Sequence, residues 1–168
     1  MEIKKELLDV IRCDNCGGSI LHDGDMTCNQ CGFVVPMKDH IPIFTPVPEE
    51  IQPTPKEMRG PDIGTPWRQA NWRFLEEQLS RLGPDDLIVD VGSGRGDFFD
   101  ALAGRKYIAL DVYPYPEVDI VCDLTKNNPF IPNSIDAVLV FNVVEHVYDT
   151  HALFDAISEM LKPGGVFL

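Results

Sequence analysis

Short apolar runs alternate with amphipathic or glycine-rich stretches through the second half of the chain. Apolar runs bounded by acidic or turn-forming residues are typical of buried parallel strands. They predict strands over residues 87–91, 106–112, 118–124 and 136–144, and the start of a fifth strand within 162–168. Residues 150–162 instead repeat apolar positions every three or four residues, which predicts an amphipathic helix. Strands and helices in alternation indicate an α/β domain with a parallel sheet, in which ligands bind at the carboxyl ends of the strands.

The region before the first of these strands carries the start and stop signals of a helix. Thr65 suits the N-cap, Pro66 suits the first helical position, and Gly83-Pro84 would end the helix. Apolar residues recur in it at helical spacing, namely Trp67, Ala70, Phe74, Leu75, Leu79 and Leu82. We expect the aromatic residues of this helix to lie in the core. The alternative is that Trp67, Trp72 or Arg73 closes over a ligand.

Four of the five cysteines form two pairs near the amino terminus. Cys13 and Cys16 make one C-x2-C pair, and Cys28 and Cys31 make a second after an eleven-residue spacer. Two residues between cysteines let both thiolates reach one tetrahedral ion. Four thiolates leave no position for water, so we predict a structural Zn²⁺ site; disulfides are the alternative, which a reducing compartment disfavours. Cys122 lies far from these pairs, and we expect it to be a buried thiol.

Seven of the fourteen prolines lie between residues 42 and 66. Such a segment cannot hold a helix and predicts an extended, fairly stiff linker. We therefore predict three parts: a small zinc ribbon over residues 1–48, a proline-rich linker over 49–65, and an α/β domain over 66–168. We expect the ribbon to behave as a module independent of the α/β domain.

Charge and hydropathy exclude some classes of partner. The chain carries 14 basic and 27 acidic side chains, a net charge of −13, and no basic stripe that would suit phosphates. Nucleic acid is therefore a disfavoured partner. No apolar run approaches the roughly 20 residues of a spanning helix, and the first residues lack the apolar core of a secretory signal. We expect a cytoplasmic protein with no membrane partner.

A glycine-rich loop follows the first predicted strand of the α/β domain. Asp90 begins the sequence D-V-G-S-G-R-G, which turns directly into a helix. Glycines at such a turn let the backbone come close to a ligand. A dinucleotide-binding G-x-G-x-x-G would need glycine at position 97, where Asp97 stands. Asp111 ends the second strand, about where a carboxylate accepts the ribose hydroxyls of a nucleoside in such sheets.

These motifs resemble the class I S-adenosylmethionine-dependent methyltransferases. The likeness rests, in chain order, on the D-x-G-x-G-x-G loop, on the acids that end the second and third strands, on Glu145-His146-Val147 and on the run LKPGG at residues 161–165. The resemblance implies a Rossmann-like sheet, incomplete at its carboxyl end, that binds S-adenosylmethionine. It implies cofactor contacts from Asp90, Gly92, Ser93, Gly94, Gly96, Asp111, Val112, Asp123, Leu124 and Asn142.

The same resemblance suggests where each part of the cofactor lies. Asp123 would pair with the adenine amine and the Leu124 amide with a ring nitrogen, while the glycine loop would contact the methionine portion through its backbone. Asp90 and the Asn142 carbonyl would lie near the methionine amino group. His146 is the candidate base, needed only if the acceptor must lose a proton; its alternative is a packing or capping residue.

Sequence motifs also suggest the class of the methyl acceptor. The E-H-V and LKPGG runs resemble ubiquinone-pathway and other small-molecule methyltransferases. Asn142-Val143-Val144 departs from the N-P-P-Y/F signature of many base and glutamine-amine methyltransferases. A small-molecule acceptor is therefore favoured over rRNA, tRNA or protein. A different class of function, a non-catalytic zinc-ribbon adaptor that binds S-adenosylmethionine, stays open.

Residues 3–45 carry a second resemblance. Both cysteine pairs and the closing phrase D-x-I-P-I, residues 39–43, are similar to the small zinc-ribbon activator subunit of tRNA, rRNA and release-factor methyltransferases. That resemblance implies a protein partner reached through the ribbon. Members of the methyltransferase family continue beyond the fifth strand with a helix and a hairpin that hold much of the acceptor pocket. We therefore expect the 168 residues to be part of a longer chain, and inactive alone.

Overall fold

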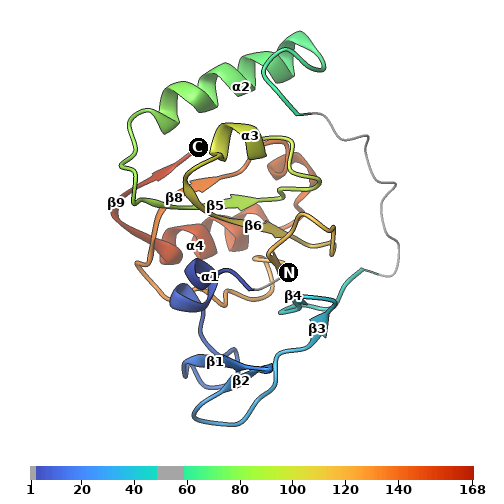
Figure 1. Ribbon diagram of the computed structural model, residues 1–168, viewed down its shortest axis with the longest axis vertical. Helices are drawn as coiled ribbons and strands as arrows, with labels where there is room; N and C mark the ends of the chain where they lie inside the picture. Colours follow the sequence, from blue (N-terminus) through green and yellow to red (C-terminus); the bar gives the residue numbers. More distant parts are fainter. Residues whose placement is uncertain (1–2, 49–58) are drawn as a thin grey trace.

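A five-stranded parallel sheet forms the centre of the molecule (Figure 1). The computed structural model describes residues 3–48 and 59–168; most of the predicted linker lies outside these ranges. The sheet has the order β7-β6-β5-β8-β9. Its strands are β5 (Leu87–Val91), β6 (Lys106–Asp111), β7 (Ile120–Val121), β8 (Ile135–Leu139) and β9 (Leu161–Phe167). The chain runs outward from β5 to β7 and then restarts beside β5 with β8, so the switch point lies between β5 and β8. The predicted α/β fold is confirmed.

Helices cover both faces of this sheet. In Figure 1, α2 (Pro66–Leu79) and α3 (Phe99–Leu102) lie on one face, and α1 (Lys5–Val10) and α4 (Thr150–Met160) lie on the other. Neighbouring residues of β5 point to opposite faces: Ile88 packs with Trp72 of α2, whereas Val89 packs in the core that holds Leu153 of α4. Such strands are buried on both sides, which explains their continuous apolar runs.

Helix α2 begins as predicted but turns a different face to the core. Thr65 is the N-cap, and its hydroxyl accepts a hydrogen bond from the Arg68 amide at 3.3 Å. The buried stripe is Arg68, Trp72, Leu75 and Leu79. The expectation of core aromatics is right for Trp72 and wrong for Trp67 and Phe74, which are exposed. The buried residues of α2 begin at Arg68 and follow one another at intervals of four, three and four positions. The rings of Trp67 and Phe74 lie outside this narrow stripe.

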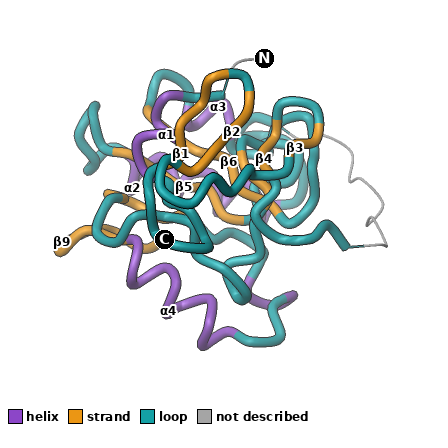
Figure 2. The backbone as a smooth tube through the Cα atoms, turned by 90° about the horizontal axis from the view of Figure 1, so that it is seen from below, coloured by secondary structure: helices purple, strands orange, loops and turns teal. Residues whose placement is uncertain are grey.

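The amino-terminal segment contains two small antiparallel hairpins. β1 (Ile20–Asp23) pairs with β2 (Asp25–Cys28), and β3 (Met37–Lys38) pairs with β4 (Ile41–Pro42). In Figure 2, which is seen from below, the β1–β2 hairpin lies beside α1. One cysteine pair precedes β1 and the other begins at the last residue of β2, so the β1–β2 hairpin holds both pairs.

This segment is packed against the sheet. Leu7, Val10 and Ile11 belong to the same buried cluster as Val89 and Ile108 of the central strands. Past β4, Ile43 pairs in parallel with Val121, and the Phe44 amide donates to the Val121 carbonyl at 2.8 Å. The amino-terminal segment therefore extends the sheet beyond β7, and the contacts argue against independent folding of the ribbon.

None of the helices in residues 3–48 and 59–168 is long and apolar enough to cross a membrane.

Candidate functional site

The glycine loop follows β5 in a conformation that requires glycine at its first position. Gly92, Gly94 and Gly96 have φ angles of 71°, 53° and 75°, all in the left-handed region. A Cβ on Gly92 would lie 2.2 Å from Cγ2 of Val143, which follows β8. The loop after β5 and the chain after β8 therefore touch at the switch point of the sheet.

Substitution of Gly92 by alanine is expected to disrupt this contact. The left-handed conformation alone costs a residue with a Cβ about 1–2 kcal/mol, and the clash with Val143 adds to it. Gly104→Ala is the matched control, because Gly104 also has a positive φ of 79° but nothing within 4 Å of the added Cβ. Urea unfolding should show a larger loss of stability for Gly92→Ala than for Gly104→Ala. Equal losses of stability would mean that the Val143 side chain moves aside without destabilising the fold.

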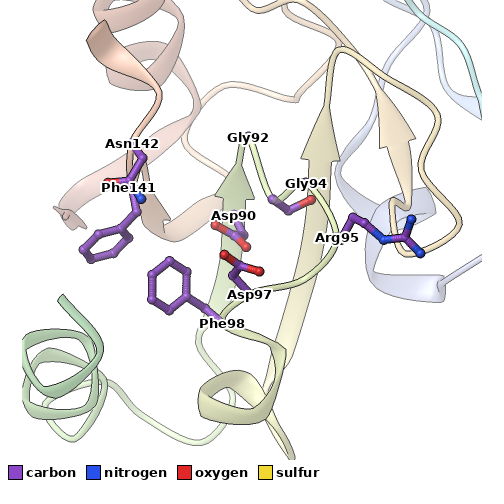
Figure 3. Close-up of a pocket in the computed structure, with 9 residues that line it drawn as sticks. Asp90, Gly92, Gly94, Arg95, Asp97, Phe98, Phe141 and Asn142 are labelled. Carbon is purple, nitrogen blue, oxygen red and sulfur yellow. The ribbon is translucent and has the colours of Figure 1, made fainter. Parts of the chain in front are cut away.

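A pocket of about 170 Å³ opens at this switch point (Figure 3). It lies between the carboxyl ends of β5 and β8, where open α/β sheets bind their ligands. Its lining consists of Asp90, Gly92, Ser93, Gly94, Arg95, Asp97, Phe98, Phe141 and Asn142. Five of the predicted cofactor residues, Asp90, Gly92, Ser93, Gly94 and Asn142, are thus brought together in one pocket.

Asp90 has a buried carboxyl group with a strongly raised pKa. Its residue is 2% exposed, and its Oδ2 atom has no hydrogen-bond partner among the described residues. Burial, followed by the charges of Asp111 and Asp97, raises the pKa of Asp90 to about 7. The buried Ser93 hydroxyl also lacks a partner within the described chain. Buried polar atoms without partners are rare, so this wall of the pocket has hydrogen-bonding capacity for a ligand.

Asp111 ends β6 and contacts the glycine loop through its carboxylate. Its Oδ2 accepts a hydrogen bond from the Gly94 amide and its Oδ1 accepts one from the Tyr113 amide, both at 2.9 Å. Burial raises the pKa of this carboxyl, against the opposing effect of these bonds. Asp111 and the following Val112 are not among the lining residues of the pocket. The carboxylate therefore braces the loop in this structure, and ribose binding stays a prediction.

Asp123 and Leu124 follow β7, two strands away from the pocket. Asp123 accepts hydrogen bonds from the amide and hydroxyl of Thr125 and pairs with Lys126 at 2.6 Å. Burial raises the pKa of Asp123, but the contacts with Lys126 and Thr125 outweigh it and lower the pKa overall. The Asp123 amide donates to the Thr45 hydroxyl at 2.8 Å. The predicted adenine contacts of Asp123 and Leu124 stay untested.

The chain after β8 contains the remaining candidates. Asn142 has a φ of 60° and lines the pocket. His146 lies in the short 3-10 helix η1 (Val144–His146), is exposed, and does not line the pocket. A catalytic role for His146 stays a prediction. Gly96 is buried, and a Cβ there would lie 2.5 Å from the Phe99 ring, so its glycine serves local packing.

Four lining residues were missed by the sequence interpretation: Arg95, Asp97, Phe98 and Phe141. Asp97 and Phe98 follow the last glycine of the loop directly, and Phe141 directly precedes Asn142. Their positions beside identified residues were the available signal. The glycine motif predicts contacts of the backbone with a ligand. It does not predict which side chains between and after the glycines line the pocket.

The four paired cysteines meet in one cluster. The Sγ atoms of Cys13, Cys16, Cys28 and Cys31 all lie within 4.8 Å of one another. Across the pairs, Cys13 and Cys31 are 3.6 Å apart and Cys16 and Cys28 are 3.5 Å apart. A zinc–sulfur bond of about 2.3 Å implies about 3.8 Å between sulfurs of a tetrahedron, so the spacing fits zinc.

Each cysteine pair forms the same turn. The amide of the glycine after each pair donates to the carbonyl of the first cysteine: Gly17 to Cys13 at 2.8 Å and Gly32 to Cys28 at 3.1 Å. Both glycines have a positive φ, which glycine adopts without strain. Each cysteine pair with its glycine, residues 13–17 and 28–32, forms one knuckle. Cys122 is elsewhere, buried, and its pKa is raised by that burial.

A family comparison identifies the region that holds the pocket. Residues 89–168 match a family model described as a methyltransferase domain. This region has an α/β, Rossmann-like methyltransferase fold. A Mycolicibacterium smegmatis protein named "Probable S-adenosylmethionine-dependent methyltransferase" is 34% identical over 95 residues, which are 51% of this chain and 37% of that protein. The ubiquinone biosynthesis O-methyltransferase of Paramagnetospirillum magneticum is 33% identical over 107 residues, 55% of this chain and 43% of that protein.

A solved structure agrees on the methyltransferase fold. The YcgJ protein of Bacillus subtilis superposes with a TM-score of 0.50 at 17% identity, covering 58% of this chain and 49% of the YcgJ chain. At that identity the likeness shows the fold alone. The chain spans less than half the length of each of these three proteins.

Proposed function

We propose that this chain is part of an S-adenosylmethionine-dependent methyltransferase. The observation that carries the proposal is the buried Asp90 carboxylate, whose Oδ2 atom has no hydrogen-bond partner among the described residues and which faces a pocket formed by a glycine loop at the switch point. S-adenosylmethionine carries a cationic sulfonium and an ammonium group, so a site with an acidic wall suits it electrostatically. The match of residues 89–168 to the methyltransferase domain supports the same conclusion.

The residues of the chain would bind and orient the reactants. The bound cofactor supplies an activated methyl group, and methyl transfer depends mainly on alignment of the acceptor with that group. Gly92 and Gly94 let the backbone approach the methionine portion, and Asp111 holds the Gly94 amide in place. The Asn142 carbonyl is a further candidate ligand. His146 would act as a base only for an acceptor that must lose a proton.

The acceptor is proposed to be a small molecule. Support comes from the 33% identity with a ubiquinone biosynthesis O-methyltransferase and from Asn142-Val143-Val144 in place of an N-P-P-Y/F motif. The net charge of −13 weighs against nucleic acid. An adaptor that binds no cofactor would have no need of a buried carboxylate facing a pocket, which favours a cofactor-binding protein. An adaptor that binds S-adenosylmethionine would need the same pocket, and a turnover assay separates it from the enzyme.

We also propose that the cysteine cluster holds a structural Zn²⁺ within a ribbon over residues 1–48, joined by a linker over 49–65 to the methyltransferase domain over 66–168. The four sulfurs support it, because their spacing fits a closed tetrahedral site. A reducing compartment such as the cytoplasm would keep these thiols available to metal. The ribbon would brace the domain, and it could also receive a protein partner.

Calorimetric titration with S-adenosylmethionine tests the proposed function. Binding by the wild-type chain, or by a longer chain that contains it, is the expected result; its absence in both would overturn the proposal. Asp111→Ala should weaken binding by roughly ten- to a hundredfold, because hydrogen bonds to a charged group contribute about 1.5–3 kcal/mol. Asp155→Ala, at an exposed position of α4, is the control and should leave the affinity unchanged. An unchanged dissociation constant in folded Asp111→Ala would contradict the role of Asp111.

A further inference from the structure

Asp97 places a second carboxylate against Asp90. It follows the last glycine of the loop, lines the pocket, and its carboxylate faces that of Asp90 (Figure 3). The charge of Asp97 contributes to the raised pKa of Asp90, as expected for two neighbouring carboxyls. The side chain of Asp97 is 37% exposed. This wall of the pocket therefore presents two acidic groups, of which Asp90 is almost completely buried.

Arg68 of α2 fixes the position of Asp97. The residue is 4% exposed, and its Nη2 donates to the Asp97 carbonyl at 3.0 Å. Its Nε lies 3.6 Å from Asp97 Oδ2. Further bonds to the carbonyls of Gly60 and Ile63, at 3.2 and 3.1 Å, occupy the same guanidinium.

The surroundings of Arg68 keep this guanidinium in place. It lies 5.8 Å from the centre of the Trp72 ring and 5.7 Å from that of Phe98. The two rings and the three carbonyl acceptors hold the guanidinium beside Asp97, and no contact joins it to Asp90 among the described residues. The Asp97 backbone is held, while its carboxylate remains at the pocket wall.

The chemistry of the two carboxylates defines the group that would satisfy them. The buried Oδ2 of Asp90 needs a hydrogen-bond donor, and two acids side by side favour a positive charge between them. An ammonium group has three donors and can reach both carboxylates at once. The sulfonium of S-adenosylmethionine has a charge but no donor, so the ammonium fits this wall better.

We propose that Asp97 binds the α-ammonium group of the cofactor together with Asp90, and that Arg68 is the positioning residue for Asp97. The proposal rests on the proposed function, since it names a further residue of the same cofactor site. It assigns a ligand role to a side chain outside the D-x-G-x-G-x-G motif.

Three ligands separate this role from a general effect on the pocket. S-adenosylmethionine and S-adenosylhomocysteine both carry the α-ammonium, whereas 5′-methylthioadenosine lacks the amino-acid portion. Asp97→Asn should weaken binding of the first two by roughly tenfold and leave methylthioadenosine unchanged in calorimetry. Asp100→Asn is the matched control, because Asp100 is exposed on α3 three residues later. It should change none of the three affinities.

Three outcomes for Asp97→Asn would overturn the proposal. Equal losses for all three ligands would indicate a structural role, and unchanged affinities would show that Asp97 does not contact the cofactor. A larger loss for S-adenosylmethionine than for S-adenosylhomocysteine would assign Asp97 to the sulfonium instead. Failure of the wild-type chain and of a longer chain to bind any of the ligands would instead refute the proposed function.

The positioning role of Arg68 is tested by its effect on ligand selectivity. Arg68→Gln should reduce the preference for S-adenosylhomocysteine over methylthioadenosine, and adding Asp97→Asn should cause little further loss. Additive losses would contradict the coupling. Because Arg68 is buried, Arg68→Lys serves as the second variant; it retains the charge and should keep more of the preference. Thermal unfolding of each variant shows whether the fold is intact.

Discussion

Removal of metal from the four-cysteine cluster is expected to unfold the amino-terminal segment and to weaken cofactor binding at the sheet. Apparent binding free energies of structural zinc reach about 10–16 kcal/mol, as large as the roughly 5–15 kcal/mol by which whole domains are stable. The small hairpins around the cluster cannot supply that stability, because they have few buried side chains of their own. Chelation should therefore release the knuckles first.

The loss is expected to spread because the segment and the sheet share contacts. Leu7, Val10 and Ile11 lie in one core with the central strands. Asn127, in the loop after β7, donates both to Asp14 of the first knuckle, at 2.6 Å, and to the Phe44 carbonyl, at 3.3 Å.

The Thr45 hydroxyl extends this link to the loop that is predicted to contact adenine, because it accepts from the Asp123 amide. Disorder of the first knuckle would remove the Asp14 contact from this loop, and unfolding of the whole amino-terminal segment would also remove the contacts of Phe44 and Thr45. Cofactor affinity should therefore fall together with stability.

Metal analysis, circular dichroism and calorimetry test this expectation. The wild-type chain should hold about one zinc, and Cys28→Ser should lose it and unfold at a lower temperature in a single transition. Cys122→Ala is the control, since Cys122 is outside the cluster and should leave the zinc content unchanged. Two separate transitions, with the second unaffected by chelation and cofactor affinity intact, would show that the ribbon and the sheet are independent modules.

The sheet could be predicted from sequence because strands β5 to β8 are largely buried on both faces, whereas the edge strand β9 is not. Such strands need continuous apolar residues, and turn-forming residues mark their ends, as at Asp90-Val91-Gly92. The pocket followed from the same rule, since the glycine loop and Asn142 both stand at carboxyl ends of strands on either side of the switch point. The metal site could be predicted likewise, because the C-x2-C spacing lets both thiolates of a pair reach one ion.

The remaining features depend on packing between distant segments. Trp67 and Trp72 are similar residues on one helix, and Trp72 is buried because it packs with residues of β5, β8 and the start of α3, whereas Trp67 is exposed. The pairing of Ile43 with Val121 joins residues that are far apart in the sequence and has no local signal. Asp97 was noticed only as the residue that breaks a dinucleotide motif, because its meaning comes from Arg68 and Asp90 beside it.

Substitution of Asp90 by asparagine is expected to stabilise the unliganded protein and to impair cofactor binding. Burial raises the pKa of Asp90 from 3.8 to about 7, so the folded state holds this proton more tightly than the unfolded state does. The contribution of Asp90 to stability is therefore greatest below about pH 4 and is lost as the pH rises through 7. One pKa unit corresponds to about 1.4 kcal/mol, so ionisation costs the folded state on the order of 4 kcal/mol.

Asparagine has nearly the shape of aspartate but no charge to bury. Urea unfolding of Asp90→Asn should show a stability that changes less between pH 5 and 8 than that of the wild type, with the larger gain at pH 8. Asp100→Asn, at an exposed position, should keep the wild-type pH dependence. A variant that is less stable than the wild type at pH 8 would contradict the cost assigned to the buried charge.

Cofactor binding should respond to pH in the opposite direction. In the proposed complex the ionised Asp90 attracts the ammonium of S-adenosylmethionine, so wild-type affinity should rise by roughly tenfold from pH 6 to 8 as a group with a pKa of about 7 loses its proton. Asp90→Asn should bind at least tenfold more weakly at pH 8 and should lose most of this rise. Any pH dependence of the affinity that remains in Asp90→Asn would report the titration of the ligand itself. Identical pH profiles for variant and wild type would show that the cofactor does not meet the Asp90 carboxylate, and the acidic wall of the pocket would then need another ligand.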